Sequence, residues 1–228
     1  MQALSTLDWF ALALWGASWA IYALIADKMA VGRNSLMSSS VKYRRKWMRE
    51  SYQRENRMPD IATIGNLMHS ATFFTSTTLL VLGALFALIG TIEKSAEIVE
   101  GVVQGLPFSV KTNETLLEIK AVVLTLTFVY AFLRFTWTIR QFNLLNIMVG
   151  AFPAHQEHRP IDEQLIEKAA RLAELAGGNF THALRAYYYA VPLLMWIVNP
   201  WLFVIGTIGI TVATYSSEFR SETVKALG

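Results

Sequence analysis

The chain has no cysteine, so disulfide bonds, thiolate nucleophiles and cysteine-ligated metals are excluded. It also has little charge, because 16% of its 228 residues are Asp, Glu, Lys or Arg, whereas soluble domains usually carry about 25%. It contains no Ser-His-Asp order, phosphate-binding loop or HExxH motif, and no pair of carboxylates falls within an apolar stretch. These absences argue against a soluble protein and against an enzyme.

Apolar residues make up 54% of the chain. A helix needs about 20 of them in succession to cross a bilayer. Four stretches meet this need, and they predict spans at about 9–27, 66–92, 119–139 and 186–215. The first is longer than the apolar part of a signal peptide and has no basic start, so we interpret it as a retained span. The predicted fold is an all-α integral membrane protein, a single-domain four-span helical bundle.

Lys and Arg are concentrated in two of the connections between these spans. Nine lie in residues 28–60 and five in residues 140–185, whereas the remaining connection has fewer and none precedes the first span. Cationic connections are retained on the cytoplasmic side of a membrane. The count therefore predicts that these two connections are cytoplasmic, that 93–118 is a loosely structured outer loop, and that both termini lie outside a bacterial-type inner membrane. Arg220 and Lys225 are the cations that disagree.

Each cytoplasmic connection contains a predicted amphipathic helix. In residues 41–57, aromatic and apolar side chains recur at helical spacing among Arg and Lys, which suits a helix lying in the lipid headgroup layer. Its predicted contacts with anionic headgroups are Arg44, Arg45, Lys46, Trp47 and Arg49. The alternative is a solvated helix that caps the bundle. In residues 162–176, apolar residues recur at intervals of three and four, and Gly177 and Gly178 are expected to end that helix.

Several sequence blocks resemble those of one membrane-protein family. They are RRKWMRESYQRENRMPDIATIGNLMHSATFFTSTT, FVYAFLRFTWTIRQFN, ELAGGNFTHALRAYYYAVPLLMWIVNPWLF and the closing YSSEFRS. Together they are similar to the family catalogued as domain of unknown function 599, over nearly the whole chain from about Asp8 to Ser221. The resemblance implies a four-span membrane protein without an assigned activity.

Arg134 interrupts the third predicted span. A guanidinium within a hydrocarbon span is expensive, so it faces a partner, a water-filled cavity or the nearby interface. Thr138 and Gln141 lie on the same helical face, four and seven residues further on. This face could bind an anion or a lipid phosphate. The alternative is a structural arginine that reaches the cytoplasmic interface.

The second predicted span has a polar stripe toward its cytoplasmic end. The candidate residues in it are Asn66, His69, Ser70 and Thr77. Small and hydroxyl-bearing side chains in such stripes usually hold helices together, at about 0.6 kcal/mol per hydrogen bond. The alternative is a hydrophilic path lining a pore, with Arg134 as its selectivity residue. Because one four-span bundle encloses little space, such a pore would lie between protomers.

The fourth predicted span contains Pro192 and Pro200, and each removes an amide donor from a helix. Asn199 can satisfy carbonyls freed by Pro200, so Asn199 and Pro200 are predicted to mark a kink. Discontinuous helices often mark transport sites, but no inverted repeat accompanies this one. The pattern therefore favours a single kinked and tilted helix.

The four histidines do not predict a metal or cofactor site. His155 and His158 have the spacing of one helical turn but lack a second pair of ligands. His69 and His182 both lie toward the cytoplasmic side, and nothing else in the sequence supports haem. We therefore expect no bound metal and no cofactor.

Two classes of function are compatible with the sequence. The first is a non-enzymatic, self-associating membrane protein in which an ion or small-solute pathway would run between protomers. The second is an accessory or scaffolding subunit docked on a larger membrane complex and on anionic lipid. The expected partners are the bilayer with its anionic headgroups and either further copies or other subunits. The small net charge of +3 argues against nucleic acid as a partner.

Overall fold

A computed structural model of the chain describes residues 4–29, 35–104, 114–154 and 160–227. In this part of the chain all regular structure is helical, which confirms the all-helical prediction. The helices are α1 (Thr6–Met29), α2 (Leu36–Gln53), α3 (Met58–Gly90), α4 (Ile92–Gln104), α5 (Glu114–Gly150), α6 (Glu163–Val198), α7 (Pro200–Phe219) and α8 (Glu222–Leu227).

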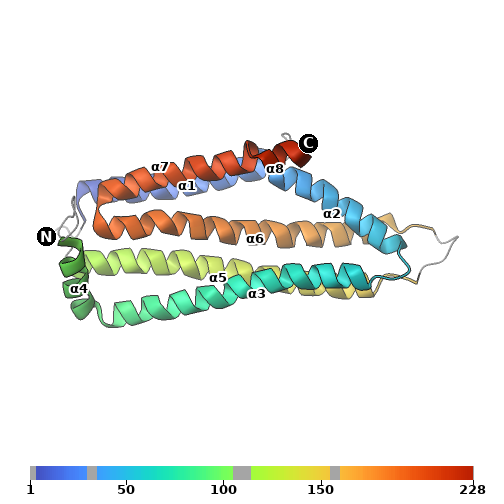
Figure 1. Cartoon of the computed structure of the whole chain (residues 1–228), viewed down its shortest axis with the longest axis horizontal. Helices are drawn as coiled ribbons and strands as arrows, with labels where there is room; N and C mark the ends of the chain where they lie inside the picture. The colour runs from blue at the N-terminus through green and yellow to red at the C-terminus, as the bar shows by residue number, and fades with distance from the viewer. Residues whose placement is uncertain (1–3, 30–34, 105–113, 155–159, 228) are drawn as a thin grey trace.

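Three long helices, α3, α5 and α6, run along the whole length of the molecule (Figure 1). They contain 33, 37 and 36 residues. At about 1.5 Å per residue, each is longer than the ~30 Å hydrocarbon core of a bilayer. α1 and α7 lie beside the part of the bundle near α4, and α2 lies beside the remainder. We call the two ends of the molecule the α4 end and the α2 end.

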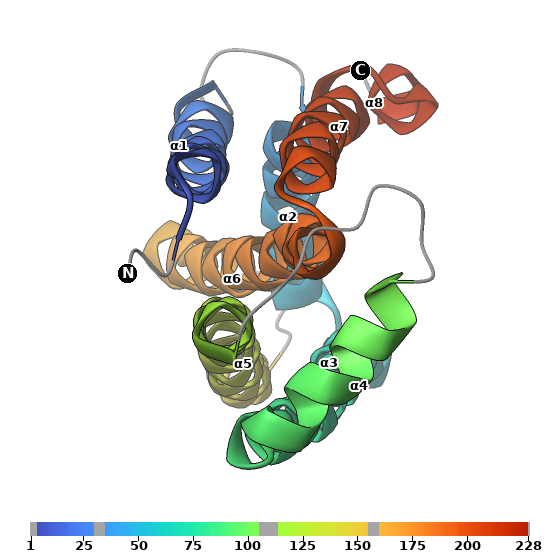
Figure 2. The same cartoon turned by 90° about the vertical axis from the view of Figure 1, so that its left-hand side faces the viewer.

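Four helices are long and apolar enough to cross a membrane, which indicates a multi-pass membrane protein. They comprise Thr6–Leu24, Met58–Gly90, Glu114–Gly150 and Pro200–Ala226. α6 runs alongside these helices but is less apolar. It lies at the centre of the bundle, between α5 on one side and the pair formed by α1 and α7 on the other (Figure 2). A helix covered by protein needs fewer apolar side chains than one that faces lipid.

The prediction of a single span over 186–215 was wrong, because the chain reverses direction at Asn199. The backbone of Asn199 is extended, and its side-chain oxygen accepts a hydrogen bond of 2.7 Å from the Trp201 amide. Pro200 occupies the first turn of α7, where its missing amide donor costs nothing. α6 and α7 therefore form an antiparallel pair, joined across it by the Tyr189 and Thr211 hydroxyls at 3.0 Å.

This reversal changes the relation between the two ends of the chain. α1 begins at the α4 end, and α7 runs from the α4 end toward the α2 end (Figure 1). The prediction that both termini lie on one side of the membrane depended on a single fourth span. It loses its basis once that span is replaced by two antiparallel helices.

The predicted helix over 162–176 is not a separate element, because α6 continues through Gly177 and Gly178 to Val198. A Cβ atom added at Gly177 would overlap the guanidinium of Arg44, which crosses α6 at this point. A glycine within a helix costs about 1 kcal/mol relative to alanine. Here the absence of a side chain allows close packing by α2, so Gly177 is a packing residue and not a helix terminator.

Two other predicted connections are also more helical than expected. α5 extends beyond 139 to Gly150, so the start of the expected connection 140–185 is helix. α4 lies across the end of the bundle, where the segment 93–118 was expected to be loosely structured (Figure 2). Gly101 lies inside α4 and does not end it.

Candidate functional site

Arg134 contacts α6 through a chain of side-chain hydrogen bonds. Its NH1 donates to Asn179 Oδ1 at 2.6 Å, and Asn179 Nδ2 donates to Gln141 Oε1 at 2.8 Å. Arg134 Nε also donates to the hydroxyl of Tyr130 at 3.1 Å, and its guanidinium lies 5.2 Å from the centre of that ring. The predicted residues thus share one face of α5, but Asn179 of α6 already forms hydrogen bonds with Arg134 and Gln141 there.

Thr138 belongs to the same contact between α5 and α6. Its hydroxyl donates to the Arg134 carbonyl at 2.9 Å, with a second acceptor, the Ala176 carbonyl, at 3.4 Å. Thr138 is fully buried. This network satisfies its polar groups within the protein, which is what intramembrane polar side chains require.

The polar stripe of α3 lies on the outside of the molecule. Asn66, His69 and Ser70 are exposed, and Thr77 is half-buried. The hydroxyls of Ser70 and Thr77 donate to the carbonyls of Asn66 and Phe73, four residues earlier in their own helix. The stripe therefore does not join α3 to the other helices of its own chain.

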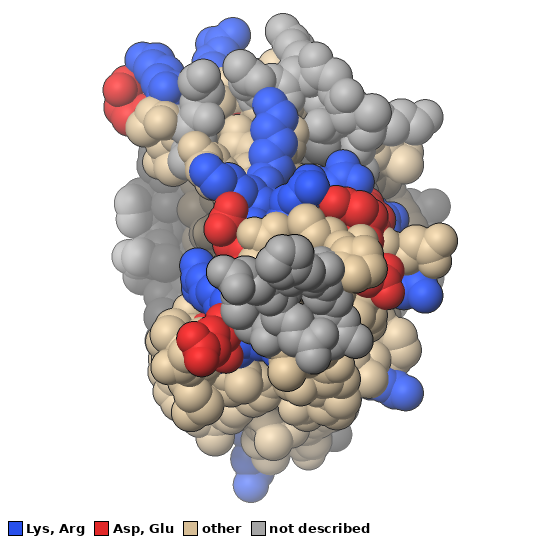
Figure 3. Space-filling view, turned by 90° about the vertical axis from the view of Figure 1, so that its right-hand side faces the viewer, with Lys and Arg blue, Asp and Glu red and all other residues tan. Residues whose placement is uncertain are grey.

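The basic helix α2 packs along the half of α6 that lies toward the α2 end. Arg45 forms an ion pair with Glu167, and Arg49 forms one of 2.7 Å with Glu163. Figure 3, which looks onto the α2 end, shows cationic and anionic side chains lying next to one another. Lys46 is exposed. Two of the five predicted headgroup contacts thus pair with carboxylates of the protein.

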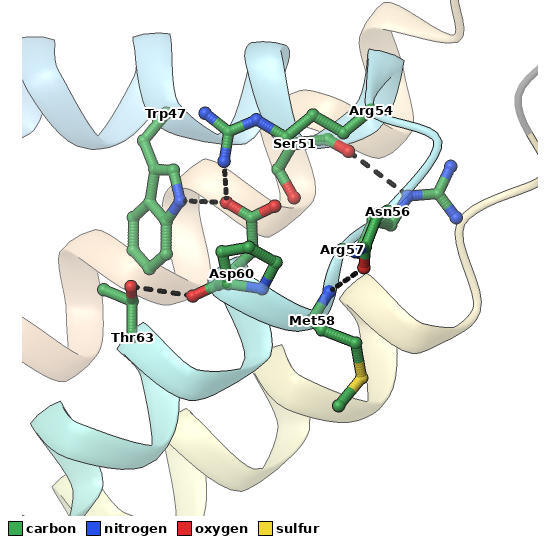
Figure 4. Close-up of polar contacts among 9 residues, drawn as sticks. Trp47, Ser51, Arg54, Asn56, Arg57, Met58, Asp60 and Thr63 are labelled. Atoms are coloured by element: carbon green, nitrogen blue, oxygen red, sulfur yellow. Dashed lines mark hydrogen bonds and ion pairs between the residues drawn. The ribbon is translucent and has the colours of Figure 1, made fainter.

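Trp47 and Asp60 join α2 to the start of α3 (Figure 4). Asp60 is 1% exposed, and its Oδ1 accepts hydrogen bonds from Trp47 Nε1 at 2.6 Å and from Arg54 NH1 at 2.8 Å. No local sequence pattern connects Asp60 to these partners. Trp47, predicted to contact lipid headgroups, is half-buried and donates to Asp60.

A second group of buried charges lies near the α4 end. Asp8 is 3% exposed and accepts a hydrogen bond of 2.7 Å from the indole nitrogen of Trp196. The ammonium of Lys120 lies 5.6 Å from the centre of the Trp196 ring. These contacts fix α1, α5 and α6 relative to one another, and the sequence pattern did not reveal them.

A cavity lies between α1, α2, α6 and α7. Its volume is about 660 Å³. Its polar lining consists of Tyr22, Ser40, Arg44, Thr181, Arg185, Tyr188, Thr214, Ser217 and Glu218, with the backbone of Gly177 and Gly178. Its apolar lining consists of Leu36, Met37, Leu184, Ile210 and Ala213. The cavity lies where the start of α2 meets the end of α7, near the end of α1. This position is at one edge of the apolar part of the bundle.

Two guanidinium groups enter this cavity. Arg44 comes from α2 and passes over Gly177, and its guanidinium makes no hydrogen bond with the described residues. Burial lowers the pKa of Arg44 from its ordinary value, and the nearby Glu174 carboxylate opposes this change. Arg185 comes from α6, is 3% exposed and lies 5.1 Å from the centre of the Tyr22 ring.

The carboxylate in the cavity lining, Glu218, is already held by the protein. It is 8% exposed, and its Oε1 accepts a hydrogen bond of 3.2 Å from the backbone amide of Met37. Tyr22 donates to the Thr214 carbonyl at 3.1 Å, so the cavity wall is rigidly connected. With two cations and one carboxylate, the lining has an excess of one positive charge. This charge balance suits an anionic ligand.

A larger hollow of about 820 Å³ lies on the outer face of α6, but all of its charged side chains except Lys168 form ion pairs within the described residues. Arg45 pairs with Glu167, and Arg171 pairs with Glu174 at 2.7 Å. The cavity around Arg44 therefore offers the stronger site for a charged ligand.

Comparison with protein-family models gives one match, to the family described as "Protein of unknown function, DUF599", over residues 10–223. The chain belongs to the DUF599 family. This confirms the resemblance seen in the sequence. No curated protein and no solved structure matched the chain. The DUF599 match includes every residue that lines the cavity.

The sequence of this DUF599 protein contained one sign of the cavity, the pair Gly177 and Gly178, which was interpreted as the end of a helix. Arg44 was predicted to contact headgroups, whereas Arg185 and Glu218 were not singled out. Among the described residues no three His, Asp or Glu side chains are close enough together to hold a metal. His155 and His158 lie outside the described residues.

Proposed function

We propose that this DUF599 protein is a non-enzymatic, multi-pass membrane protein that binds an anionic ligand in the cavity between α1, α2, α6 and α7. The observation that carries this proposal is Arg44, a half-buried cation that lines the cavity and makes no hydrogen bond with the described residues. An arginine presents five donors in a planar fork that fits phosphate or carboxylate. Removing a charge partly from water without such a partner is costly, so a bound anion would stabilise this arrangement.

Binding, rather than catalysis, is what the lining supports. It presents hydroxyls and guanidinium groups, which recognise an anion. Its carboxylate, Glu218, accepts a hydrogen bond from Met37 and lies within the wall of the cavity. The proposal therefore assigns Glu218 a structural role in holding α2 against α7.

The proposed orientation places the α2 end in the cytoplasm of a bacterial-type cell. Residues 28–60 carry nine Lys or Arg residues, and cationic segments stay on the inner face. Since α7 runs toward the α2 end, Arg220 and Lys225 now lie on the same side as this basic segment. These two cations disagreed with the prediction that both termini lie outside. They support the proposed orientation, in which the start of α1 lies outside and α8 lies inside.

Thermal unfolding of the purified protein in a neutral detergent tests the anion site. A soluble phosphate monoester or an anionic phospholipid should raise the melting temperature, because a ligand that binds only the folded state stabilises it. Arg44→Gln should lose most of this increase. Lys46→Gln removes the same charge from an exposed position on the same helix and should keep it. If neither kind of anion stabilises the wild-type protein, the proposal is wrong.

A second candidate function, self-association, is favoured by the outward polar stripe of α3. Asn66, His69 and Ser70 face away from the rest of the chain, and polar side chains in a membrane associate with other helices. Arg134 contacts Asn179 and is not part of this proposed interface. The mass of the detergent-solubilised protein tests it, since a monomer at all concentrations would exclude self-association.

A further inference from the structure

We infer that the ligand of the cavity is a membrane phospholipid with one anionic phosphate, whose acyl chain lies along α6. This inference rests on the proposed anion site and names its ligand class. It comes from three features of the structure: the charge of the cavity, its position along the bundle, and an apolar row that continues from it.

The charge of the cavity fits a single phosphate. Arg44 and Arg185 approach from α2 and α6, and Glu218 offsets one of the two positive charges. A phosphodiester carries one negative charge, so it would neutralise the lining. The hydroxyls of Ser40, Thr181 and Ser217 line the same space. They can donate to the remaining phosphate oxygens or to a glycerol headgroup.

The position of the cavity fits a headgroup and not a group deep in the membrane. In the sequence the apolar stretch of α1 ends at Ala26, about one helical turn beyond Tyr22 in the cavity wall. On the other side, α2 carries the basic segment that marks the interface. A phosphate held by Arg44 would therefore lie at the edge of the hydrocarbon layer.

An apolar row leads from the cavity toward the α4 end. Tyr188 lines the cavity, and Val191 and Met195 follow it at intervals of three and four residues, on the same face of α6. These side chains are 46%, 42% and 40% exposed, whereas much of α6 is buried. Gly206 of α7 faces the sulfur of Met195, so α7 borders the row.

The length of this row matches one leaflet of a bilayer. Leu184, in the cavity wall and on the same face of α6, lies eleven positions before Met195. At about 1.5 Å per residue the row is about 16 Å long, close to half of the ~30 Å hydrocarbon core. A phosphate site joined to an apolar row of this length fits a lipid better than a soluble phosphate.

Native mass spectrometry of the full chain, titrated with three probes, tests the inference. The probes are dioleoyl phosphatidylglycerol, dioleoylglycerol, which lacks the phosphate, and glycerol 3-phosphate, which lacks the acyl chains. The whole lipid should bind about tenfold or more tightly than either part, since only it makes both the charge-assisted hydrogen bonds and the apolar contacts. This comparison uses wild-type protein and needs no variant to fold.

Two variants then locate the phosphate. Arg44→Gln should lower the affinity for the whole lipid about tenfold, toward that of dioleoylglycerol. Gly177→Ala keeps the charge but places a Cβ where the Arg44 guanidinium lies, so it should have the same effect. Lys46→Gln should bind like wild type.

The possible outcomes separate this inference from the proposed function. If glycerol 3-phosphate binds as tightly as the whole lipid, the anion site stands and the lipid inference is overturned. If dioleoylglycerol binds as tightly as the whole lipid, both are overturned. An equal loss of affinity in Lys46→Gln and Arg44→Gln would show general surface attraction and would also overturn both. A second protein copy covering the apolar row would appear as a dimer that binds none of the three probes, and this would overturn the lipid inference.

Discussion

At the scale of single residues, Asp60 makes a buried polar contact between α2 and α3. Trp47 and Arg54 both donate to the same carboxylate oxygen, and the carboxylate is almost fully buried. Trp47 lies in α2, and Arg54 directly follows that helix. One side chain at the start of α3 therefore contacts both α2 and the residue that follows it.

Asp60→Ala should destabilise the protein by roughly 2–3 kcal/mol, because it removes two hydrogen bonds to a buried carboxylate and leaves the half-buried indole of Trp47 without its acceptor. Unfolding in mixed micelles measures this loss. Glu55→Ala changes an exposed carboxylate nearby and serves as the control, with an expected change within about 0.5 kcal/mol. Equal stabilities of the two variants would contradict the role of Asp60.

The sequence predicted which residues share a helical face but not what they contact. Helical periodicity correctly grouped Arg134, Thr138 and Gln141, because a face depends only on spacing along one helix. Their partner Asn179 is 45 residues from Arg134, and no local pattern connects the two. The same limit applies to Arg44 and Gly177, whose contact depends on how α2 crosses α6.

At the scale of elements, the turn at Asn199 determines the topology. An uncharged stretch with two prolines is compatible with a kinked helix and with two antiparallel helices, and hydropathy does not distinguish them. In the structure, the extended backbone of Asn199 and its hydrogen bond with the Trp201 amide separate two antiparallel helices. The sequence therefore gave the position of the break but not its geometry.

Asn199→Ala should lower the stability by about 1 kcal/mol, the usual cost of removing a helix N-cap. Pro200→Ala should have little effect on stability, because the first turn of a helix leaves its amides without intrahelical partners in any case. Thermal unfolding of the two variants in the same detergent compares them. A loss in Pro200→Ala as large as that in Asn199→Ala would show that proline rigidity, and not the cap, maintains the turn.

At the scale of the whole molecule, the bundle is longer than a membrane is thick. α3, α5 and α6 extend beyond the part covered by α1 and α7, and the remainder packs with α2. The core of this α2 end contains Met48, Ile64, Phe142 and Leu145, with several alanines of α6. Composition alone predicted the apolar spans. It did not predict that the same helices continue and pack with α2, because their faces there carry charged residues.

The proposed orientation can be tested with single cysteines, because the chain has none of its own. Glu114→Cys lies at the α4 end, whereas Lys46→Cys and Lys225→Cys lie toward the α2 end, and all three positions are exposed. A membrane-impermeant maleimide added to intact cells should label only the first. The other two should react only after the membrane is opened. Labelling of Lys225→Cys in intact cells would contradict the proposed orientation.

The central position of α6 has a consequence for how the protein enters a membrane. α6 leaves the ribosome before α7, but it is less apolar than its neighbours and carries Arg185, and an arginine at a helix centre costs about 2.5 kcal/mol on insertion scales. We expect α6 to insert only together with α7, as a hairpin folded at Asn199. A chain that stops after Val198 should leave its last helix uninserted, so that a cysteine at the half-buried position 198 stays unlabelled from outside the cell. The most protected helix of the finished bundle would then be the one least able to cross the membrane alone.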